Sequence, residues 1–402
     1  MLTVPSALSD RESWLEPFDW YEQMRADAPV RYDERRGAWD VFRYDAVKSV
    51  LDDDEQFSVD PRNAAGARPG EDDGPIGGTM LTRDPPRHDE LRSVVEEAFR
   101  PRQLRELEPR MRAMTHELLD EALADADGQF DLVEALSYPL PVIVIAELLG
   151  VPSDEREQFK RWSDTVVRSA DDTAEAETVV DDQQNAGEEM ADYFARQIEA
   201  RRQEPRDDLL TTIATNEGDG GRLSRREALG MCTLLLTAGN ITTTNLITNA
   251  VRCLDTQDAE THARLADDEA ALTSAIEETL RHRSPVQAIL RNVTEETELG
   301  GETLQPGEEV VLWAGSANRD EHQFDDADSF QPDRSPNQHL GFGYGTHYCL
   351  GAPLARLEAK VALDVLLNRL SGIEVVDTEL QPVRSSFIYG VESLPVSYES
   401  AG

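Results

Sequence analysis

The chain has 402 residues, of which 80 are acidic and 39 basic, and its formal net charge is −41 at pH 7. Such a field repels nucleic acid and anionic lipid surfaces, and no stretch of about twenty apolar residues is present to cross a membrane. The N-terminus shows no signal peptide, and three cysteines do not suggest a disulfide framework. We therefore expect a cytoplasmic protein without nucleic-acid or membrane partners.

The acidic residues are dispersed among periodic apolar positions along the whole chain. Blocks of like charge often indicate disorder, whereas here the charges alternate with a regular apolar pattern. We therefore hypothesise that the protein comes from a salt-adapted organism, because counter-ions in a salt-rich cytoplasm would screen the self-repulsion.

The first part of the chain combines a helical pattern over residues 20–26 with a strand-like segment at 38–42, after an irregular segment at 1–19. Residues 60–78 are rich in Gly, Pro and charge and are predicted to form a long loop. The acidic stretch 171–182 is predicted to be a mobile surface connection. Helical patterns dominate between these segments, over residues 87–99, 104–124, 142–149, 155–170 and 185–202.

Residues 223–251 predict a long helix whose apolar middle, 231–238, indicates burial on all sides. Another helix is expected at 270–283, and short strands with glycine turns follow Pro285 and continue beyond Gly372. Neither an internal repeat nor a convincing linker is present. The pattern predicts one mainly α domain with small β-sheets, over residues 1–402.

The run FGYGTHYCLG surrounds Cys349 with the groups that a thiolate-to-iron bond needs. Gly343 and Gly345 allow the backbone to turn tightly and to lie close against a flat ligand. The cysteine precedes a predicted helix over residues 352–367, whose positive end and free amides favour the thiolate. A cysteine thiolate is one of the few protein ligands that hold haem iron. A lone cysteine without this context would be a small buried apolar residue.

The pattern Phe-Gly-x-Gly-x-His-x-Cys-x-Gly resembles the haem-binding signature of the cytochrome P-450 family. The likeness runs from about residue 20 to the C-terminus, through five motifs in the family's order, and is closest to the prokaryotic members. It implies a single-domain, mainly α, triangular fold with haem b between the long helix and the cysteine loop. Cys349 would be the iron ligand, and Phe342, Gly343 and Gly351 would belong to the haem-binding loop.

Four cationic or ionisable side chains match positions that bind the haem propionates in this family. His88 and Arg92 lie four residues apart on one predicted helical face and resemble the family's Pro-x-His-x-x-x-Arg segment. The resemblance adds Arg291 and His347. Arginine suits carboxylates because its fork donates two parallel hydrogen bonds. Any one of these residues alone would be interpreted as a solvated surface charge.

The long helix contains the sequence AGNITT at residues 238–243, which resembles the Ala-Gly-x-(Asp/Glu)-Thr-Thr pattern of the family's oxygen-binding helix. The resemblance implies that Gly239 leaves a groove for a diatomic ligand and that Thr242 is the oxygen-side hydroxyl. Ile241 stands where an acid normally relays protons. Proton delivery would then use water, Thr242, Asn240 or a group that the motif does not identify.

The spacing of Glu278 and Arg281 places an acid and an arginine one turn apart on a predicted helix. The same spacing occurs elsewhere in the chain, so the context decides: Ser284-Pro follows at once, and Arg334 lies shortly before the cysteine run. In the family, these three residues form a buried ion network near the haem. The resemblance therefore implies a structural role for them.

The resemblance implies a monooxygenase that inserts one atom of O2 into a small apolar organic substrate, with two electrons supplied from outside. The chain has neither a dinucleotide fingerprint nor a cysteine set for an iron–sulfur cluster. A ferredoxin- or flavodoxin-type carrier with its NAD(P)H reductase is therefore expected, docking on Arg100, Arg102, Arg105 and Arg356. The residues expected to contact substrate are Met80, Leu81, Leu235, Val286, Ile289 and Phe387.

Two alternatives remain open because Ile241 departs from the family pattern. One is a haem-thiolate enzyme that uses peroxide or rearranges an oxygenated substrate without a reductase. Peroxide-using relatives tend to place an arginine and a proline where Asn240 to Thr242 stand here, which argues against this reading. The other is a non-catalytic haem protein that senses or carries a diatomic gas.

Overall fold

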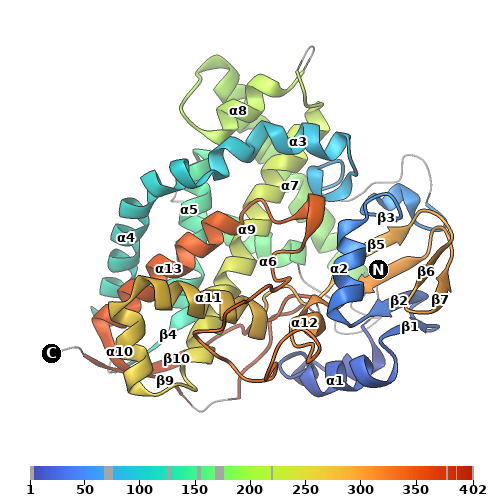
Figure 1. Cartoon of the computed structure of the whole chain (residues 1–402). Coiled ribbons are helices and arrows are strands. Elements are labelled where there is room, and N and C mark those ends of the chain that lie inside the picture. The colour runs from blue at the N-terminus through green and yellow to red at the C-terminus, as the bar shows by residue number, and fades with distance from the viewer. Residues whose placement is uncertain are drawn as a thin grey trace.

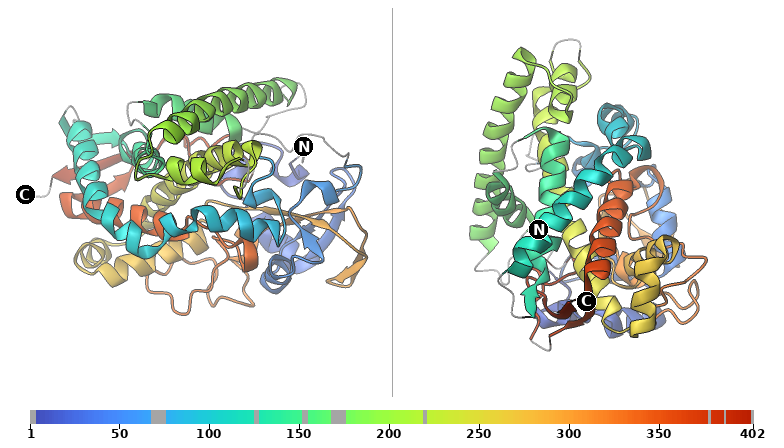
Figure 2. Two further views of the ribbon diagram at one scale, coloured as in Figure 1. Left: turned by 90° about the horizontal axis from the view of Figure 1, so that it is seen from above. Right: turned by 90° about the vertical axis from the view of Figure 1, so that its left-hand side faces the viewer.

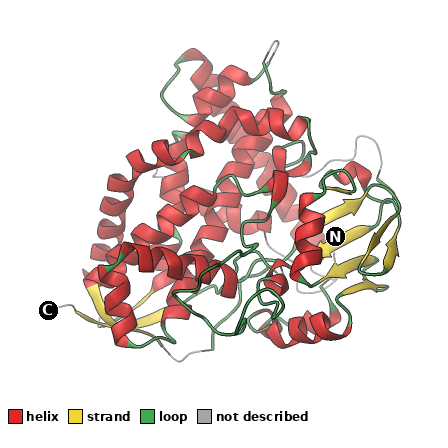
Figure 3. Cartoon of the chain, in the orientation of Figure 1, coloured by secondary structure: helices red, strands yellow, loops and turns green. Residues whose placement is uncertain are grey.

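A helical body and a smaller sheet region lie next to each other in the computed structural model of the chain (Figures 1 and 3). The structure describes residues 4–67, 76–124, 128–151, 155–167, 176–218, 221–376, 379–385 and 387–400. The outline is roughly triangular, with α8 (Leu209–Asn216) at the top of Figure 1 and the strands of the main sheet at the right. Within the described ranges, no helix combines the length and the apolar character needed to span a bilayer.

Helices make up most of the fold (Figure 3). Single turns of 3-10 helix lie at Met80–Thr82, Glu96–Phe99 and Gly345–His347, and a π-helical turn lies at Val133–Ser137. Further 3-10 turns lie at Ser6–Leu8, Glu12–Trp14 and Pro61–Asn63. Besides α8, the α-helices of the described residues are α1 (Phe18–Asp27), α2 (Tyr44–Asp52), α3 (Arg87–Val95), α4 (Pro101–Ala124), α5 (Pro139–Leu149), α6 (Arg156–Val167), α7 (Ala176–Gln203), α9 (Arg225–Leu254), α10 (Ala259–Asp267), α11 (Glu269–His282), α12 (Ala314–Ala317) and α13 (Ala352–Arg369).

The strands of the described residues form three small sheets. The largest has the order β1-β2-β8-β5-β3, and only the β2–β8 pair in it is parallel. Its strands are β1 (Val30–Asp33), β2 (Ala38–Val41), β3 (Phe57–Ser58), β5 (Ile289–Val293) and β8 (Glu309–Leu312). The second sheet has the order β4-β10-β9 and contains β4 (Gln129–Asp131), β9 (Leu370–Val375) and β10 (Pro395–Ser400). The third is the hairpin of β6 (Thr297–Leu299) and β7 (Glu302–Leu304).

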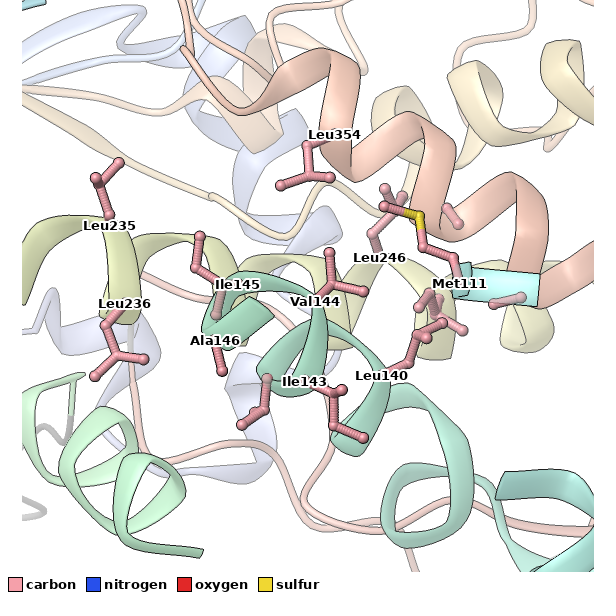
Figure 4. Close-up of a cluster of buried hydrophobic side chains, with 14 of the residues drawn as sticks. Met111, Leu140, Ile143, Val144, Ile145, Ala146, Leu235, Leu236, Leu246 and Leu354 are labelled. Carbon is pink, nitrogen blue, oxygen red and sulfur yellow. The ribbon is translucent and has the colours of Figure 1, made fainter. Parts of the chain in front are cut away.

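The central helix α9 begins at a well-formed cap and is buried over most of its length. The Ser224 side chain accepts from the backbone of Glu227, whose side chain bonds back to the cap, so two free N–H groups at the start are satisfied. Helix α5 is apolar on all sides and packs against α9. Figure 4 shows side chains of both helices, including Val144 and Leu235, in one buried cluster together with Leu354 of α13.

The structure confirms the prediction of a mainly α fold with small sheets, but it corrects one segment. Residues 176–182, predicted to be part of a mobile connection, belong to α7, while 168–175 lie outside the described residues. The cause is a periodic apolar face, since Val179, Ala186 and Met190 are buried and the acids occupy other faces. Both views in Figure 2 show α7 along the outer side of the helical body.

Four short α-helices were not predicted from the sequence: α2, α8, α10 and the single turn α12. In helix α2 the apolar periodicity that predicts a helix is weak, because Val47, Val50 and Leu51 make one buried stripe in only nine residues. The predicted loop at 60–78 contains a 3-10 turn at Pro61–Asn63, and its residues 68–75 lie outside the described part of the chain.

Candidate active site

The loop before α13 places Cys349 at the start of that helix. Gly343 and Gly345 have φ values of +72° and +70°, a region that favours glycine. A Cβ on Gly345 would lie 2.7 Å from the carbonyl oxygen of Leu51, so the loop also packs tightly against the end of α2. The Cys349 amide donates to the carbonyl oxygen of Phe342 at 2.9 Å, which closes the turn.

Cys349 is exposed at its side chain, in contrast to Cys232 and Cys253, which are buried. Partial loss of hydration next to the surrounding protein atoms nevertheless raises the pKa of the Cys349 thiol, although the amides of Gly351 and Ala352 and nearby arginine charges oppose the rise. The amides at the start of α13 therefore favour the thiolate, but the loss of hydration outweighs their effect on the pKa of Cys349. These donors would still stabilise a thiolate that a bound metal ion had already deprotonated.

Three of the four predicted haem-binding side chains converge on the fourth, His347, beside the cysteine loop. The rings of His88 and His347 lie 4.4 Å apart between centroids. Arg92 of α3 donates to the carbonyl oxygen of Tyr348 at 2.9 Å. Burial, followed by the charges of Arg291, His88 and Arg92, lowers the pKa of His347 to about 3. Arg291, Arg92 and the two histidines, which are all basic groups, therefore lie close together.

This cluster has donor atoms that protein groups do not use. Nε of Arg291 and Nε2 of His347 are buried and have no hydrogen-bond partner among the described residues. Burial also lowers the pKa of Arg291 to about 10, and the acids Asp54 and Asp84 oppose the change only in part. Buried donors without partners are unfavourable, so an anionic ligand would stabilise them. Two carboxylates on one ligand fit this arrangement.

Helix α9 opens on one face in the middle of its buried stretch. Ala238 is exposed and Gly239 and Thr242 are half-exposed, while Thr237, Asn240 and Ile241 beside them are buried. A Cβ on Gly239 would meet nothing within 4 Å, so there is space over this glycine. The Thr242 hydroxyl donates to the carbonyl oxygen of Ala238 at 2.8 Å. This face offers a hydroxyl beside an opening and no carboxylate of its own.

The predicted ion network is assembled around one fully buried carboxylate. Glu278 accepts two hydrogen bonds from Arg281, at 2.7 and 2.8 Å, and two from Arg334, at 3.0 and 3.1 Å. Sequence reasoning missed two more donors, the Asn337 side chain at 3.1 Å and the Gln331 amide at 2.9 Å. Both come from the irregular segment that leads to the cysteine loop. The network therefore joins α11 to that segment.

The arginine of α11 extends the network into the same segment. Arg281 donates to the carbonyl oxygens of Asn318, Ala327 and Ser329 at 2.7–2.9 Å. A second link, also missed, involves Glu277 on the neighbouring position of α11. Hydrogen bonds from Arg356 and His339 outweigh burial and lower the pKa of Glu277 to about 2.

The residues predicted to contact substrate fall into two groups. Met80 and Leu235 belong to the buried cluster of the helical body, and Leu81 next to them in sequence is 48% exposed. Val286, Ile289 and Phe387 lie by the sheet, where the Gln287 amide donates to the Phe387 carbonyl oxygen at 2.8 Å and Val286 bridges to Ile388. In the described part of the chain, no hydrogen bond joins the two groups.

Comparison with known proteins decides the family. The sequence matches the cytochrome P-450 family over residues 18–388. The chain belongs to this family. Cytochrome P-450 109 of Bacillus spizizenii is 42% identical over 97% of this chain and 93% of its own length. The erythromycin C-12 hydroxylase of Saccharopolyspora erythraea is 40% identical over 94% and 93%.

The fold agrees with solved structures of cytochromes P-450. CYP109E1 of Bacillus megaterium, in complex with testosterone, superposes with a TM-score of 0.89 and 43% identity, over 96% of this chain and 99% of that chain. The chain described here is therefore a haem-thiolate monooxygenase that binds haem b, takes electrons from redox partners and acts on an organic substrate. The peroxide-using, rearranging and gas-sensing alternatives are not favoured, because relatives are hydroxylases and epoxidases.

The residues present fit the haem that the family binds. The unpaired donors of Arg291 and His347 suit propionates, Cys349 offers a thiol, and the face at Gly239 leaves room for a ligand on the opposite side. Each of these observations concerns a different part of the haem. They come from β5, the cysteine loop and α9, which the fold brings to one region.

The Glu278 network predicts a strong effect of one substitution. Glu278→Ala leaves two buried guanidinium groups without their carboxylate, which typically costs about 3–5 kcal/mol in the free energy of unfolding. We expect little folded, haem-loaded protein, measured by urea denaturation and by haem content. Glu269→Ala, at the exposed start of α11, removes only a surface pair with Lys360 and should cost less than about 1 kcal/mol. Equal losses for the two variants would contradict a special role for Glu278.

Proposed function

We propose that Cys349 is the proximal ligand of haem iron in this monooxygenase. The single observation that supports the assignment best is the exposed thiol at the start of α13, framed by Phe342, Gly343 and Gly351. The same proposal assigns the propionates to His88, Arg92, Arg291 and His347, and the unpaired buried nitrogens of Arg291 and His347 support it.

The bound haem supplies activation of O2, and the chain supplies the surroundings. On the cysteine side, the amides of Gly351 and Ala352 stabilise negative charge on Sγ. On the opposite side, we assign Gly239 to the opening and Thr242 to the hydroxyl that holds a proton next to it. Because the Thr242 proton is directed to the Ala238 carbonyl oxygen, the hydroxyl oxygen is free to accept a hydrogen bond.

The ligand assignment is tested by replacing the thiol. Cys349→Ser should abolish the absorption of the reduced carbonyl complex that a thiolate ligand produces, because a serine hydroxyl is a far poorer iron ligand. Circular dichroism should show that the variant is folded, and Cys253→Ser, a change at a buried cysteine, should keep the carbonyl spectrum. An unchanged spectrum in Cys349→Ser would refute the assignment.

We also propose that the electron donor is a ferredoxin- or flavodoxin-type carrier with its NAD(P)H reductase. Such carriers are acidic, and exposed arginines at the start of α4 offer a complementary surface. Of the arginines expected to contribute, Arg100 pairs with Glu96 and Glu97, and Arg356 is held by Glu277. Arg102 and Arg105 are exposed, so they are the stronger candidates.

For the substrate, we propose an apolar molecule of about steroid size. Related CYP109E1 structures hold testosterone or corticosterone, and a related enzyme hydroxylates erythromycin. The side chains expected to line the site here are apolar, as in Leu81, Leu235 and Ile289.

This substrate class predicts a spectral response. Testosterone added to the ferric protein should shift the haem absorption, because a bound substrate displaces the water on the iron. Gly239→Phe, which fills the space over the open face of α9, should abolish the shift, whereas Leu290→Ala, at an exposed sheet position, should not. A full shift in Gly239→Phe would place the substrate elsewhere. If neither testosterone nor corticosterone shifts the haem absorption, the steroid class is excluded.

Finally, we propose that the protein is adapted to high salt. The support is the net charge of −41 on a chain whose 39 basic residues include only three lysines. Screening by salt lowers the self-repulsion of a folded protein. Helical circular dichroism should therefore fall on dialysis from molar to millimolar KCl and return on adding salt. A signal that does not change between the two conditions would refute the proposal.

A further inference from the structure

Arg356 of α13 holds a positive charge against the cysteine loop. Its guanidinium carbon lies 4.5 Å from the centre of the Phe342 ring, within the range of a cation–π contact. Its Nη1 donates to the hydroxyl of Tyr348 at 3.1 Å. Both rings belong to the immediate surroundings of Cys349, because Tyr348 precedes the cysteine and the Phe342 carbonyl oxygen accepts from the Cys349 amide at 2.9 Å. The charge therefore contacts the loop at two points.

The other edge of the same guanidinium is bound to Glu277 of α11. Nε donates to Oε1 at 2.7 Å and Nη2 donates to Oε2 at 2.9 Å. A bidentate pair of this kind fixes the orientation of the guanidinium as well as its position. Glu277 is therefore a positioning residue for Arg356.

A histidine holds the carboxylate of Glu277 in turn. Nδ1 of His339 accepts from the Gly341 amide at 3.1 Å, so the ring proton lies on Nε2. Nε2 lies 3.0 Å from Oε2 of Glu277 and donates to it. The His339 side chain is 4% exposed, and its ring lies 6.1 Å from that of Phe342. The carboxylate is thus held by donors from α13 and from the segment before the cysteine.

Both members of the pair are charged at neutral pH. Burial acts against ionisation of Glu277, but the hydrogen bonds from Arg356 and His339 lower its pKa to about 2. Burial also disfavours the charge of Arg356, and its hydrogen bonds to Glu277 and Tyr348 raise the pKa in spite of it. The two side chains are 32% and 25% exposed, so water weakens their field without removing it.

The pair has a direction relative to the loop. Arg356 stands between the carboxylate of Glu277 and the hydroxyl of Tyr348, so its positive end faces the loop. In agreement, the charge of Arg356 is among the effects that oppose the rise caused by lost hydration in the pKa of Cys349. Because both edges of the guanidinium already have partners within the chain, Arg356 is a poor docking group for a carrier.

We propose that Arg356, held in place by Glu277, presents a fixed positive charge to the cysteine loop and raises the reduction potential of the haem iron. The inference rests on the proposed role of Cys349 as the iron ligand. One electron from the carrier makes the group at Cys349 more negative by one charge. A positive charge nearby favours that state and a negative charge opposes it. Removal of the two members of the pair should therefore have opposite effects.

The test is a redox titration of the purified holoenzyme with a chemical reductant and mediator dyes. This measurement uses no carrier, so a role in docking alone would not affect it. Arg356→Gln should lower the reduction potential, and Arg356→Lys, which keeps the charge, should stay near the wild-type value. Glu277→Gln should raise the potential, because it removes a negative charge while the new amide oxygen can still accept from Arg356.

The control is a second arginine–carboxylate pair with the same geometry. Arg264 of α10 donates to the two oxygens of Asp333 at 2.7 and 2.9 Å. Neither residue has a hydrogen bond to the cysteine loop within the described ranges. Arg264→Gln changes the net charge of the chain by the same amount as Arg356→Gln and should leave the potential unchanged.

The sign of the shifts separates the possibilities. Shifts in the same direction in Arg356→Gln and Glu277→Gln would mean that the pair merely holds the loop, and they would overturn the proposal. An unchanged potential in Arg356→Gln, or an equal shift in Arg264→Gln, would overturn it too. If Arg356→Gln does not retain haem, Glu277→Gln still decides, since a potential that is not raised there contradicts the proposal. A wild-type protein without the thiolate carbonyl spectrum would contradict the assignment of Cys349 instead.

Discussion

The geometry of the site depends on one carboxylate that is withdrawn from water. Glu278 is fully buried and is surrounded by hydrogen-bond donors from Arg281, Arg334, Asn337 and the backbone of Gln331. A charge in this position is tolerable only when every donor is in place. Most of these donors lie on a long segment with little regular structure, which lacks a hydrogen-bonded ladder of its own. The network therefore substitutes for secondary structure directly before the cysteine loop.

Helix α9 combines properties that are usually kept apart. It is a core helix, buried over nearly its whole length and packed against the apolar α5, yet it carries buried asparagines and threonines and opens at Gly239. Apolar packing fixes its position, and the polar groups make part of its interior suitable for water.

Much of the site was predictable because its motifs are local. The cysteine loop, the His88–Arg92 face and the Glu278–Arg281 spacing each lie within ten residues, so side chains in contact are also close in sequence. The missing parts depend on tertiary structure. Asn337 and His339 have no pattern that marks them, and they acquire partners only because the segment folds back on α11.

Two pKa values depend on how far the fold removes a group from water, which the sequence does not show. Loss of hydration raises the pKa of Cys349 more than the amides at the start of α13 lower it, and hydration depends on the whole fold. The pKa of Glu358 on α13 is likewise raised, to about 8, because this side chain is buried.

The topology of the main sheet has a consequence for biosynthesis. Strand β2, near the N-terminus, pairs in parallel with β8, and β5 with Arg291 lies on the other side of β8. During translation, β1 and β2 can pair with each other early. The other edge of β2 stays unpaired until β8, which ends at residue 312, has left the ribosome. The cysteine loop emerges later still. With Cys349 as the proposed ligand, the haem would be captured by an almost complete chain, and the early segments would be open to aggregation or chaperone binding for most of their synthesis.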